Sequence, residues 1–246
     1  MESSPAQRYL AEFLGTFALL FVGTGAAVFS YSWATDPVSR WLLIAFAFGV
    51  TVAVSVYALG DVSGGHFNPA ITLSMALSGR MPRRDVVPYL VAQVLGALVG
   101  VLVIMGIAYG DSTAWAAAQK TAIAAQAYSG ASGSPSTFTL GSVFLLELVA
   151  TFLFVLVIQF VTRPESSAKN MAPLAIGLTL VVIHLGALPV DGASFNPARS
   201  FAPAVLSSGW SGSTWAIQDD WLFWVAPILG GLLASVVESA LRPKTT

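Results

Sequence analysis

The sequence predicts an all-α membrane protein with six transmembrane helices and two shorter, re-entrant half-helices arranged as an inverted repeat. Three observations support this fold class. Hydrophobic residues make up 56% of the 246 residues and charged residues only 9%, whereas soluble domains carry about 25% charged residues. Several apolar stretches reach about 20 residues, the length that crosses a bilayer as a helix. The triplet Asn-Pro-Ala occurs twice, each time at the start of a shorter apolar run.

The expected spans follow one another in two groups of three. They cover roughly residues 9–31, 41–61, 86–109, 138–162, 171–190 and 221–241. One short apolar run precedes the third span and another precedes the sixth. The order is therefore three helices with a half-helix before the third, followed by the same arrangement again.

The two halves of the chain share landmarks in the same order. The first span of each half contains an acidic residue, Glu12 in AEFLGTFALLF and Glu147 in LELVATFLFVL. A glycine in the second span, Gly49 or Gly177, lies nineteen residues before the Asn of the triplet in both halves. Because each half has an odd number of spans, the second half must sit upside down relative to the first.

These repeats define the domain organisation. We interpret residues 1–246 as a single domain with repeats at about 8–109 and 138–242. The Ala-, Ser-, Gly- and Thr-rich segment 110–137 is expected to join them on the outer face. Inverted repeats that enclose one central path form one unit, because neither half encloses that path alone.

Basic residues orient the chain, since cytoplasmic loops are enriched in Lys and Arg. With both termini in the cytoplasm, eight basic residues face that side: Arg8, Arg80, Arg83, Arg84, Arg163, Lys169, Arg242 and Lys244. Only Arg40, Lys120 and Arg199 then face outward. We therefore expect cytoplasmic termini. The short termini and the lack of an evident signal peptide suit a prokaryotic cytoplasmic (inner) membrane.

Charge and composition exclude several function classes. The net charge of −1 lacks the excess of basic residues that nucleic-acid binding requires. The chain has no cysteine, which excludes disulfides, thiolate chemistry and Cys-ligated metals. No metal and no cofactor are expected.

Each Asn-Pro-Ala triplet has the pattern of a helix start, with Asn as N-cap and Pro at the first helical position. The triplets comprise Asn68, Pro69 and Ala70, and Asn196, Pro197 and Ala198. Interrupted helices in matching positions of two repeats point to a transport site near the bilayer midplane. We therefore predict a pore with these residues at its centre. The simpler alternative is that the two Asn side chains only cap their helices.

The chain resembles the aquaporins, the major intrinsic protein family, over essentially its whole length. The resemblance rests on both triplets, on the Arg199 that follows the second, on the two Glu-containing spans and on the intervals between them. It implies a passive channel for water that excludes protons, ions and glycerol and needs no energy input. It also implies a homotetramer in the lipid bilayer, with one pore in each subunit.

The resemblance implies how such a pore handles water. Carbonyl groups before each triplet are expected to accept hydrogen bonds from water, and the residues that carry them are Gly64, Gly65, His66, Gly192, Ala193 and Ser194. Non-helical backbone is tolerated at membrane depth only where it lines such a path or is buried in protein. The two half-helix N-termini each contribute about half a positive charge, which opposes cations and protons but not neutral water.

A selectivity filter nearer the outside is implied in the same way. Its four positions fall on Phe48, His184, Ala193 and Arg199. Phe48 is expected to narrow the hole, and His184 and Arg199 to supply donors. Ala193 replaces the Cys or Thr often found there and should widen the filter slightly. The alternative for His184 is a packed core histidine, and the ring of His66 is expected to be structural.

Further positions separate the water branch of the family from the glycerol branch. Members of the glycerol branch have Asp directly after the second-triplet Arg and a basic residue four positions further on, where this chain has Ser200 and Ala204. The pair Phe223-Trp224 is typical of the water branch. The expected function is therefore a water channel. The alternative is a channel that also passes ammonia, hydrogen peroxide or glycerol.

Glu12 and Glu147 are the acidic residues deep in the spans. Intramembrane carboxylates often form proton relays. Their symmetric placement instead favours a structural role, in which each accepts hydrogen bonds from the loop before a half-helix. Asp191 stands where many relatives have Thr.

Three other classes remain as rivals. A secondary transporter with inverted repeats also has broken helices at the midplane, but it would need further ionisable groups for ion coupling. An intramembrane enzyme would need a nucleophile–base pair or a metal-binding pattern, and the sequence shows neither. A purely structural membrane protein would not require two triplets or Arg199.

Overall fold

The computed structural model describes residues 3–34, 36–130, 134–210 and 214–242, and within these ranges it contains no strand. The α-helices are α1 (Pro5–Trp33), α2 (Pro37–Ser63), α3 (Pro69–Leu77), α4 (Val86–Tyr109), α5 (Ser112–Lys120), α6 (Leu140–Val161), α7 (Ala172–Asp191), α8 (Pro197–Ser208) and α9 (Trp215–Leu241). Short 3-10 helices occur at η1 (Arg83–Asp85), η2 (Ala122–Ala124) and η3 (Lys169–Met171).

Six of these helices are long and apolar enough to cross a membrane, namely α1, α2, α4, α6, α7 and α9. Together with the short helices α3 and α8, they confirm the predicted fold class. The expected span 86–109 coincides with α4. α9 begins before the expected residue 221. The expected start was too late because the first turns contain the polar residues Gln218, Asp219 and Asp220, which lower the local hydropathy.

The segment between the halves contains more structure than the sequence indicated. α5 and η2 lie within 110–137, where we expected only a connecting loop. Asp111 caps α5 by accepting hydrogen bonds from the N–H groups of Thr113 and Ala114, at 3.0 and 2.9 Å. Residues 131–133 of this segment, and Lys244, lie outside the described residues.

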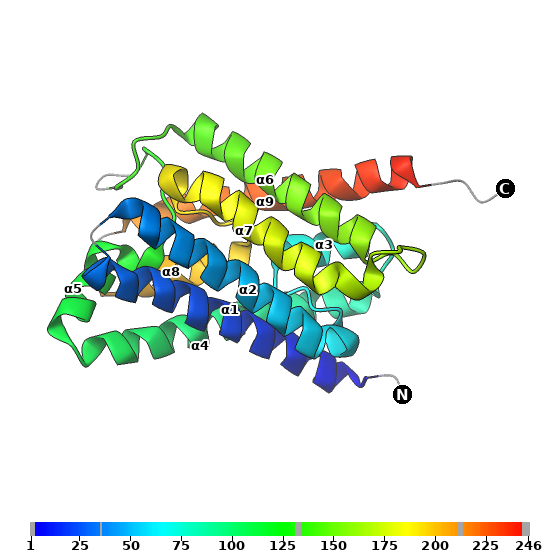
Figure 1. The fold of residues 1–246 in the computed structure, drawn as a ribbon, viewed down its shortest axis with the longest axis horizontal. Coiled ribbons are helices and arrows are strands. Elements are labelled where there is room, and N and C mark those ends of the chain that lie inside the picture. Colours follow the sequence, from blue (N-terminus) through cyan, green and yellow to red (C-terminus); the bar gives the residue numbers. More distant parts are fainter. Residues whose placement is uncertain (1–2, 35, 131–133, 211–213, 243–246) are drawn as a thin grey trace.

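The long helices run side by side, and the start of α1 and the end of α9 lie at the same end of the molecule (Figure 1). α5 lies at the opposite end. The main helix pairs are α1 with α4, α6 with α9, and α2 with α7. Each of the short helices α3 and α8 packs against both α4 and α9. The two half-helices are therefore enclosed by helices from both halves of the chain.

Glycines allow the helix pairs to approach closely. A Cβ atom at Gly96 in α4 would lie 2.3 Å from the Phe13 carbonyl oxygen, and one at Gly230 in α9 would lie 2.3 Å from that of Leu148. In the third pair, Gly49 of α2 and Gly177 of α7 face each other, since a Cβ on either would lie 2.5 Å from the other's carbonyl oxygen. Small residues at such crossings are typical of helix packing in membranes.

Candidate functional site

The two Asn-Pro-Ala triplets meet in the interior of the molecule. Each Asn caps its own half-helix: Asn68 Oδ1 accepts from the Ala70 N–H at 2.8 Å, and Asn196 Oδ1 accepts from the Ala198 N–H at 3.1 Å. Pro69 and Pro197 occupy the first helical positions. The helix starts therefore form as the sequence predicted.

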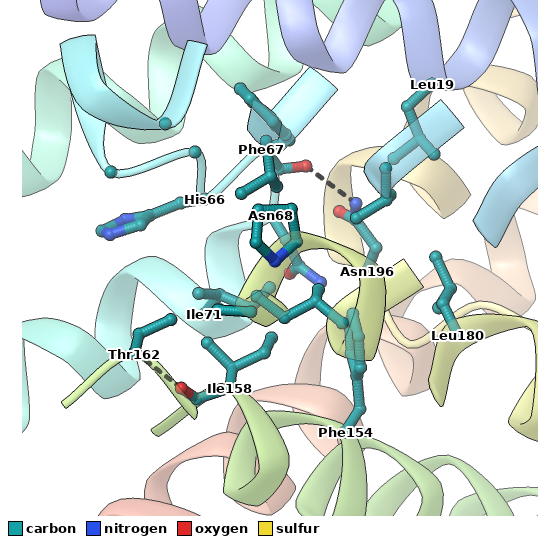
Figure 2. Close-up of a pocket in the computed structure, with 18 of the residues that line it drawn as sticks. Leu19, His66, Phe67, Asn68, Ile71, Phe154, Ile158, Thr162, Leu180 and Asn196 are labelled. Atoms are coloured by element: carbon teal, nitrogen blue, oxygen red, sulfur yellow. Dashed lines mark hydrogen bonds between the residues drawn. The ribbon is translucent and has the colours of Figure 1, made fainter. Parts of the chain in front are cut away.

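Each Asn side chain also binds the opposite half of the chain. Asn68 Nδ2 donates to the Phe195 carbonyl oxygen at 2.8 Å, and Asn196 Nδ2 donates to the Phe67 carbonyl oxygen at 2.9 Å. Figure 2 shows Asn68 and Asn196 close together, with the Asn196 bond drawn. An amide group has two N–H donors. One N–H of each Asn therefore remains available to a molecule in the neighbouring cavity.

A cavity of about 310 Å³ runs past the two Asn residues and is lined from both halves of the chain. Its lining includes the predicted residues Gly64, Gly65, His66, Ser194, Phe48 and His184. Apolar side chains, among them Leu19, Ile71 and Phe154, form much of the rest (Figure 2). The result is a mostly apolar passage with a few polar groups, the composition expected of a site for a small neutral molecule.

The loops before the half-helices have matching backbone conformations. Gly64 and Gly192 have φ values of 92° and 89°, which end α2 and α7 in the left-handed region. Phe67 and Phe195, one residue before each Asn, have φ values of 50° and 57°. Non-glycine residues rarely adopt this region. Such strain persists where the surroundings hold it in place.

Two buried glutamates hold these loops. Glu12 accepts hydrogen bonds from the backbone N–H groups of His66 and Phe67, at 2.9 and 2.7 Å. Glu147 accepts from those of Ser194 and Phe195, at 2.7 and 2.8 Å. Both carboxyl groups are fully buried. The geometry thus gives each glutamate the loop-binding contacts that the resemblance implied.

Phe48, His184 and Arg199 come together toward the end of the cavity that lies near η2. The rings of Phe48 and His184 stack with centroids 5.0 Å apart, and the Arg199 guanidinium carbon lies 5.0 Å from the Phe48 ring centroid. Arg199 is 2% exposed and donates to the carbonyl oxygens of Ala124, at 2.8 Å, and Gly192, at 3.2 Å. Three elements from distant parts of the chain therefore form one polar constriction.

Two buried polar atoms in this cluster make no hydrogen bond to the described residues. Arg199 Nε and His184 Nε2 are buried and have no hydrogen-bond partner among the described residues. His184 Nδ1 lies 2.9 Å from the Leu180 carbonyl oxygen, which can only accept. In the neutral ring, Nε2 is then an acceptor, where the resemblance had implied a donor. The cluster thus offers a passing water molecule one donor and one acceptor.

The fourth expected filter residue, Ala193, lies apart from the cavity surface. It is fully buried and lines neither the main cavity nor the outer one described next. Its φ of 54° places it in the left-handed region, at the position that Gly65 (φ 66°) occupies in the other loop. Its place in a filter remains a prediction.

A second cavity of about 450 Å³ adjoins the constriction, and Arg199 lines both cavities. Gly192 lines this second cavity, together with Arg40 and Lys120. The cationic groups of Arg40 and Lys120 lie 4.8 and 5.3 Å from the ring centroid of Tyr31. The three basic residues that were predicted to face outward therefore line this one cavity, which forms one mouth of the passage. No motif in the sequence pointed to Tyr31.

The opposite mouth has a different set of charges. Arg80 lines the main cavity there and donates to the Gln159 carbonyl oxygen at 3.0 Å and to that of Thr162 at 2.8 Å. Burial lowers the pKa of the Arg80 guanidinium, but an arginine remains protonated in proteins. Arg8 pairs with Asp85 at 2.9 Å nearby. The distribution of basic residues along the chain predicts that these arginines face one side of the membrane, but it does not indicate that Arg80 lines the cavity.

The described residues contain no group of three or more His, Asp or Glu side chains that could hold a metal ion. The arrangement instead suits passage: a narrow path with hydrogen-bonding groups, two helix N-termini at its centre and a fixed positive charge at one constriction.

Comparisons with known proteins agree with this geometry. The family model described as "Major intrinsic protein" matches residues 1–238. A protein named Aquaporin Z from Rhodopseudomonas palustris is 41% identical over 239 residues, which cover 97% of this chain and 95% of the relative. Aquaporin Z from Bradyrhizobium diazoefficiens is 39% identical over 244 residues, covering 98% of this chain and 95% of the relative. The solved structure of the aquaglyceroporin from Plasmodium falciparum superimposes with a TM-score of 0.82 at 23% identity, covering 97% of both chains, and supports the fold alone.

Proposed function

The chain belongs to the major intrinsic protein family, and from this premise we propose that it is a passive water channel that excludes protons, ions and glycerol. Membership makes it an integral membrane channel rather than an enzyme. The finer assignment to water depends on the site. The observation that carries it is the constriction around Phe48, whose ring lies 5.0 Å from the stacked ring of His184 and 5.0 Å from the guanidinium carbon of Arg199.

This constriction favours a small, polar, uncharged permeant. The fixed guanidinium charge of Arg199 repels cations, and the Phe48 ring lies next to it and adds an apolar surface. The unpartnered Arg199 Nε and His184 Nε2 can replace hydrogen bonds that water loses on leaving its neighbours. A larger polyol would have to fit its carbon backbone past the same side chains. Pore size and lining groups together therefore select water.

The centre of the cavity supplies a second barrier. The half-helices α3 and α8 direct their N-termini at the same region, where each contributes about half a positive charge. The free N–H groups of Asn68 and Asn196 can donate to the oxygen of a passing water molecule. A water held in this way cannot accept a proton from the next one. The acceptors along the path are then the carbonyl groups of residues that line one of the two cavities, namely Gly64, Gly65, His66, Gly192 and Ser194.

Stopped-flow light scattering on proteoliposomes tests this function. After an osmotic jump with an impermeant solute, we expect faster shrinkage than in empty liposomes, with a weak temperature dependence, and no entry of glycerol in a parallel experiment. Replacing Phe48 and His184 together by Ala should admit glycerol. The matched control Phe21→Ala, on a ring that stacks on Phe17 and does not line the cavity, should not. Water permeability equal to that of empty liposomes would contradict the proposal.

A second candidate is a channel that also passes small neutral solutes such as ammonia, hydrogen peroxide or glycerol. The residue that favours it is Ala193, which is smaller than the Cys or Thr often found at this filter position, although its side chain lines neither cavity. Glycerol entry into wild-type proteoliposomes at a rate comparable to water would support this candidate. Flux that saturates with solute concentration would instead indicate a secondary transporter.

The assembly and orientation are proposed on the same basis. We expect one domain, a homotetramer with one pore in each subunit, and cytoplasmic termini in a bacterial inner membrane. The grouping of Arg8, Arg80 and Arg163 near the end that carries the termini supports this orientation. Native mass spectrometry of the detergent-solubilised protein tests the tetramer. Reporter fusions to the C-terminus, active only on one side of the membrane, test the orientation.

A further inference from the structure

The two loop-binding glutamates differ in the side chains that donate to them. Besides its two backbone donors, Glu12 accepts from Ser63 Oγ at 2.7 Å and from Gln93 Nε2 at 2.8 Å. Each of its carboxylate oxygens therefore has two donors. Glu147 accepts from two backbone N–H groups, and no side-chain donor to it occurs among the described residues other than the group considered next.

The positions of the missing donors can be located by symmetry. Ser63 is the last residue of α2, and Asp191 is the last residue of α7. Both lie five residues before the Asn of their triplet. Gln93 lies three residues before Gly96, and Pro227 lies three residues before the equivalent Gly230. Pro227 has no donor, so of the two equivalent positions only that of Asp191 can supply a side-chain hydrogen bond to Glu147.

Asp191 is placed to make that bond. It is 5% exposed, and its Oδ1 accepts from the Ala193 N–H at 2.8 Å, just as Ser63 Oγ accepts from the Gly65 N–H at 3.1 Å. Its Oδ2 is buried without a hydrogen-bond partner, and Asp191 occupies the position from which Ser63 Oγ donates to Glu12 in the other half of the chain. Two ionised carboxylates only accept, so the bond requires a proton on one of them.

We propose that Asp191 and Glu147 share one proton, so that Asp191 gives Glu147 the hydrogen bond that Ser63 gives Glu12. The shared proton sets the charge beside the constriction. With it, the pair carries one negative charge, which balances the single positive charge of Arg199. Without it, the same buried region would carry a net negative charge. Two neighbouring buried carboxyl groups disfavour the second ionisation, because it would place like charges side by side.

This inference makes Asp191 a positioning residue for selectivity and rests on the proposed function. Glu147 from α6 and Arg199 from α8 act on it electrostatically. Arg40 of α2 and Lys120 of α5 line the same second cavity as Asp191. The preceding loop contacts it through the Ala127 N–H, at 3.1 Å from the Asp191 carbonyl oxygen, and the next residue, Tyr128, donates its N–H to Asp219 of α9. A net negative charge there would attract the cations that Arg199 repels.

Infrared spectroscopy of the reconstituted protein tests the shared proton without reference to permeation. Wild type at neutral pH should show the C=O band of a protonated carboxylic acid, and Asp191→Asn should lose one such band, since its amide can donate to Glu147 and accept from Ala193. Any band from another buried carboxyl group, such as that of Asp220, is common to both samples and cancels in the difference spectrum. The matched variant Ser63→Asp should gain a band by creating the same pair at Glu12. Identical wild-type and Asp191→Asn spectra would overturn the proposal.

Sodium leak into proteoliposomes as a function of pH tests the consequence for selectivity. As pH rises and the shared proton is lost, leak through the wild type should increase by about tenfold, the effect of about 1.4 kcal/mol on a barrier. Asp191→Asn, which has no such proton, should show a flat profile. Equal profiles would refute the charge role. If water permeation fails while the infrared band behaves as expected, the proposed function is wrong and the shared proton stands.

Discussion

The two re-entrant segments have nearly the same backbone but different chemistry. Each begins at a left-handed glycine, each is held by a buried glutamate, and each ends in an Asn-capped half-helix. The residue three positions after the Asn is Ile71 in one segment and Arg199 in the other. The comparison teaches that a duplicated scaffold forms the passage, and that a few unmatched side chains give one end of it a positively charged polar cluster.

The two re-entrant segments also contain equivalent polar contacts between the loop and its half-helix. His66 Nδ1 lies 3.1 Å from Thr72 Oγ1 in the first segment. Ser194 and Ser200, at the equivalent positions, are joined by a hydrogen bond between their hydroxyl groups. Both pairs link the loop to the first turn of its half-helix. The differences are therefore concentrated at Arg199, Ala193 and Asp191, all near one constriction.

The largest effect should come from the glutamates, where the comparison predicts unequal losses. Glu12→Gln turns one acceptor oxygen into a donor and leaves two buried donors unpaired, which should cost about 2–6 kcal/mol of unfolding free energy. Glu147→Gln should cost about 1–3 kcal/mol, because its amide can donate to Asp191. Unfolding in mixed detergent micelles measures both. A large change in proton flux through folded Glu147→Gln would revive a relay role.

Glycine substitutions at the equivalent crossings should give equal losses. Ala at Gly96 or Gly230 would place a Cβ atom 2.3 Å from a carbonyl oxygen, and overpacking of this kind costs about 1–3 kcal/mol. Gly106→Ala, in the same helix as Gly96 but with no atom within 4 Å of the new Cβ, is the control. The same unfolding assay should show no loss for it. If Gly96→Ala behaves like Gly106→Ala, the close crossing is not required for stability.

The functional difference between the segments depends on Arg199. Arg199→Val should raise leak of sodium or glycerol by about tenfold, equivalent to a barrier lowered by about 1.4 kcal/mol. Ile71→Val, at the equivalent position of α3, should leave selectivity unchanged. Solute fluxes into proteoliposomes, normalised to the amount of folded protein, measure both variants. Unchanged selectivity in Arg199→Val would remove this residue from the proposed filter.

The smallest effect concerns Gly65 and Ala193, which share a left-handed conformation. Gly65→Ala should cost about 1–2 kcal/mol, the penalty for a Cβ atom in this region. Ala193→Gly should relieve that penalty, less about 0.5–1 kcal/mol for the greater freedom of glycine in the unfolded chain. The expected net gain is therefore about 0–1.5 kcal/mol by the same assay. Destabilisation by Ala193→Gly would show that its buried methyl group contributes through packing.

Hydropathy and helix-start patterns were sufficient to predict the architecture. The six membrane-length helices and both half-helices formed where long apolar runs and Asn-Pro steps indicated them. α5 was not predicted because it is short and consists mostly of Ala and polar residues, which form no long apolar run. The early start of α9 was missed because polar residues open the helix. Both features depend on packing partners that a window of neighbouring residues does not contain.

The site could be predicted only where residue spacing constrained it. Intervals measured from the second triplet led to His184 and Arg199, and the structure brings both to Phe48. Tyr31 could not be found in this way, because its contact with Arg40 and Lys120 joins α1, α2 and α5. The role of Asp191 also required the structure, since only the comparison with Ser63 shows which donor Glu147 lacks.

The crossed hydrogen bonds of the two Asn side chains constrain how the chain can be made. The Asn68 side chain donates to a carbonyl group 127 residues further along the chain. The Phe67 carbonyl group accepts from a side-chain amide 129 residues further along. At about 5–20 residues per second, a ribosome needs on the order of 10 s to supply those partners. During that interval the first half-helix lacks the contact that fixes its start. Closure of the passage is therefore a late event in biogenesis and must follow membrane insertion of the second half.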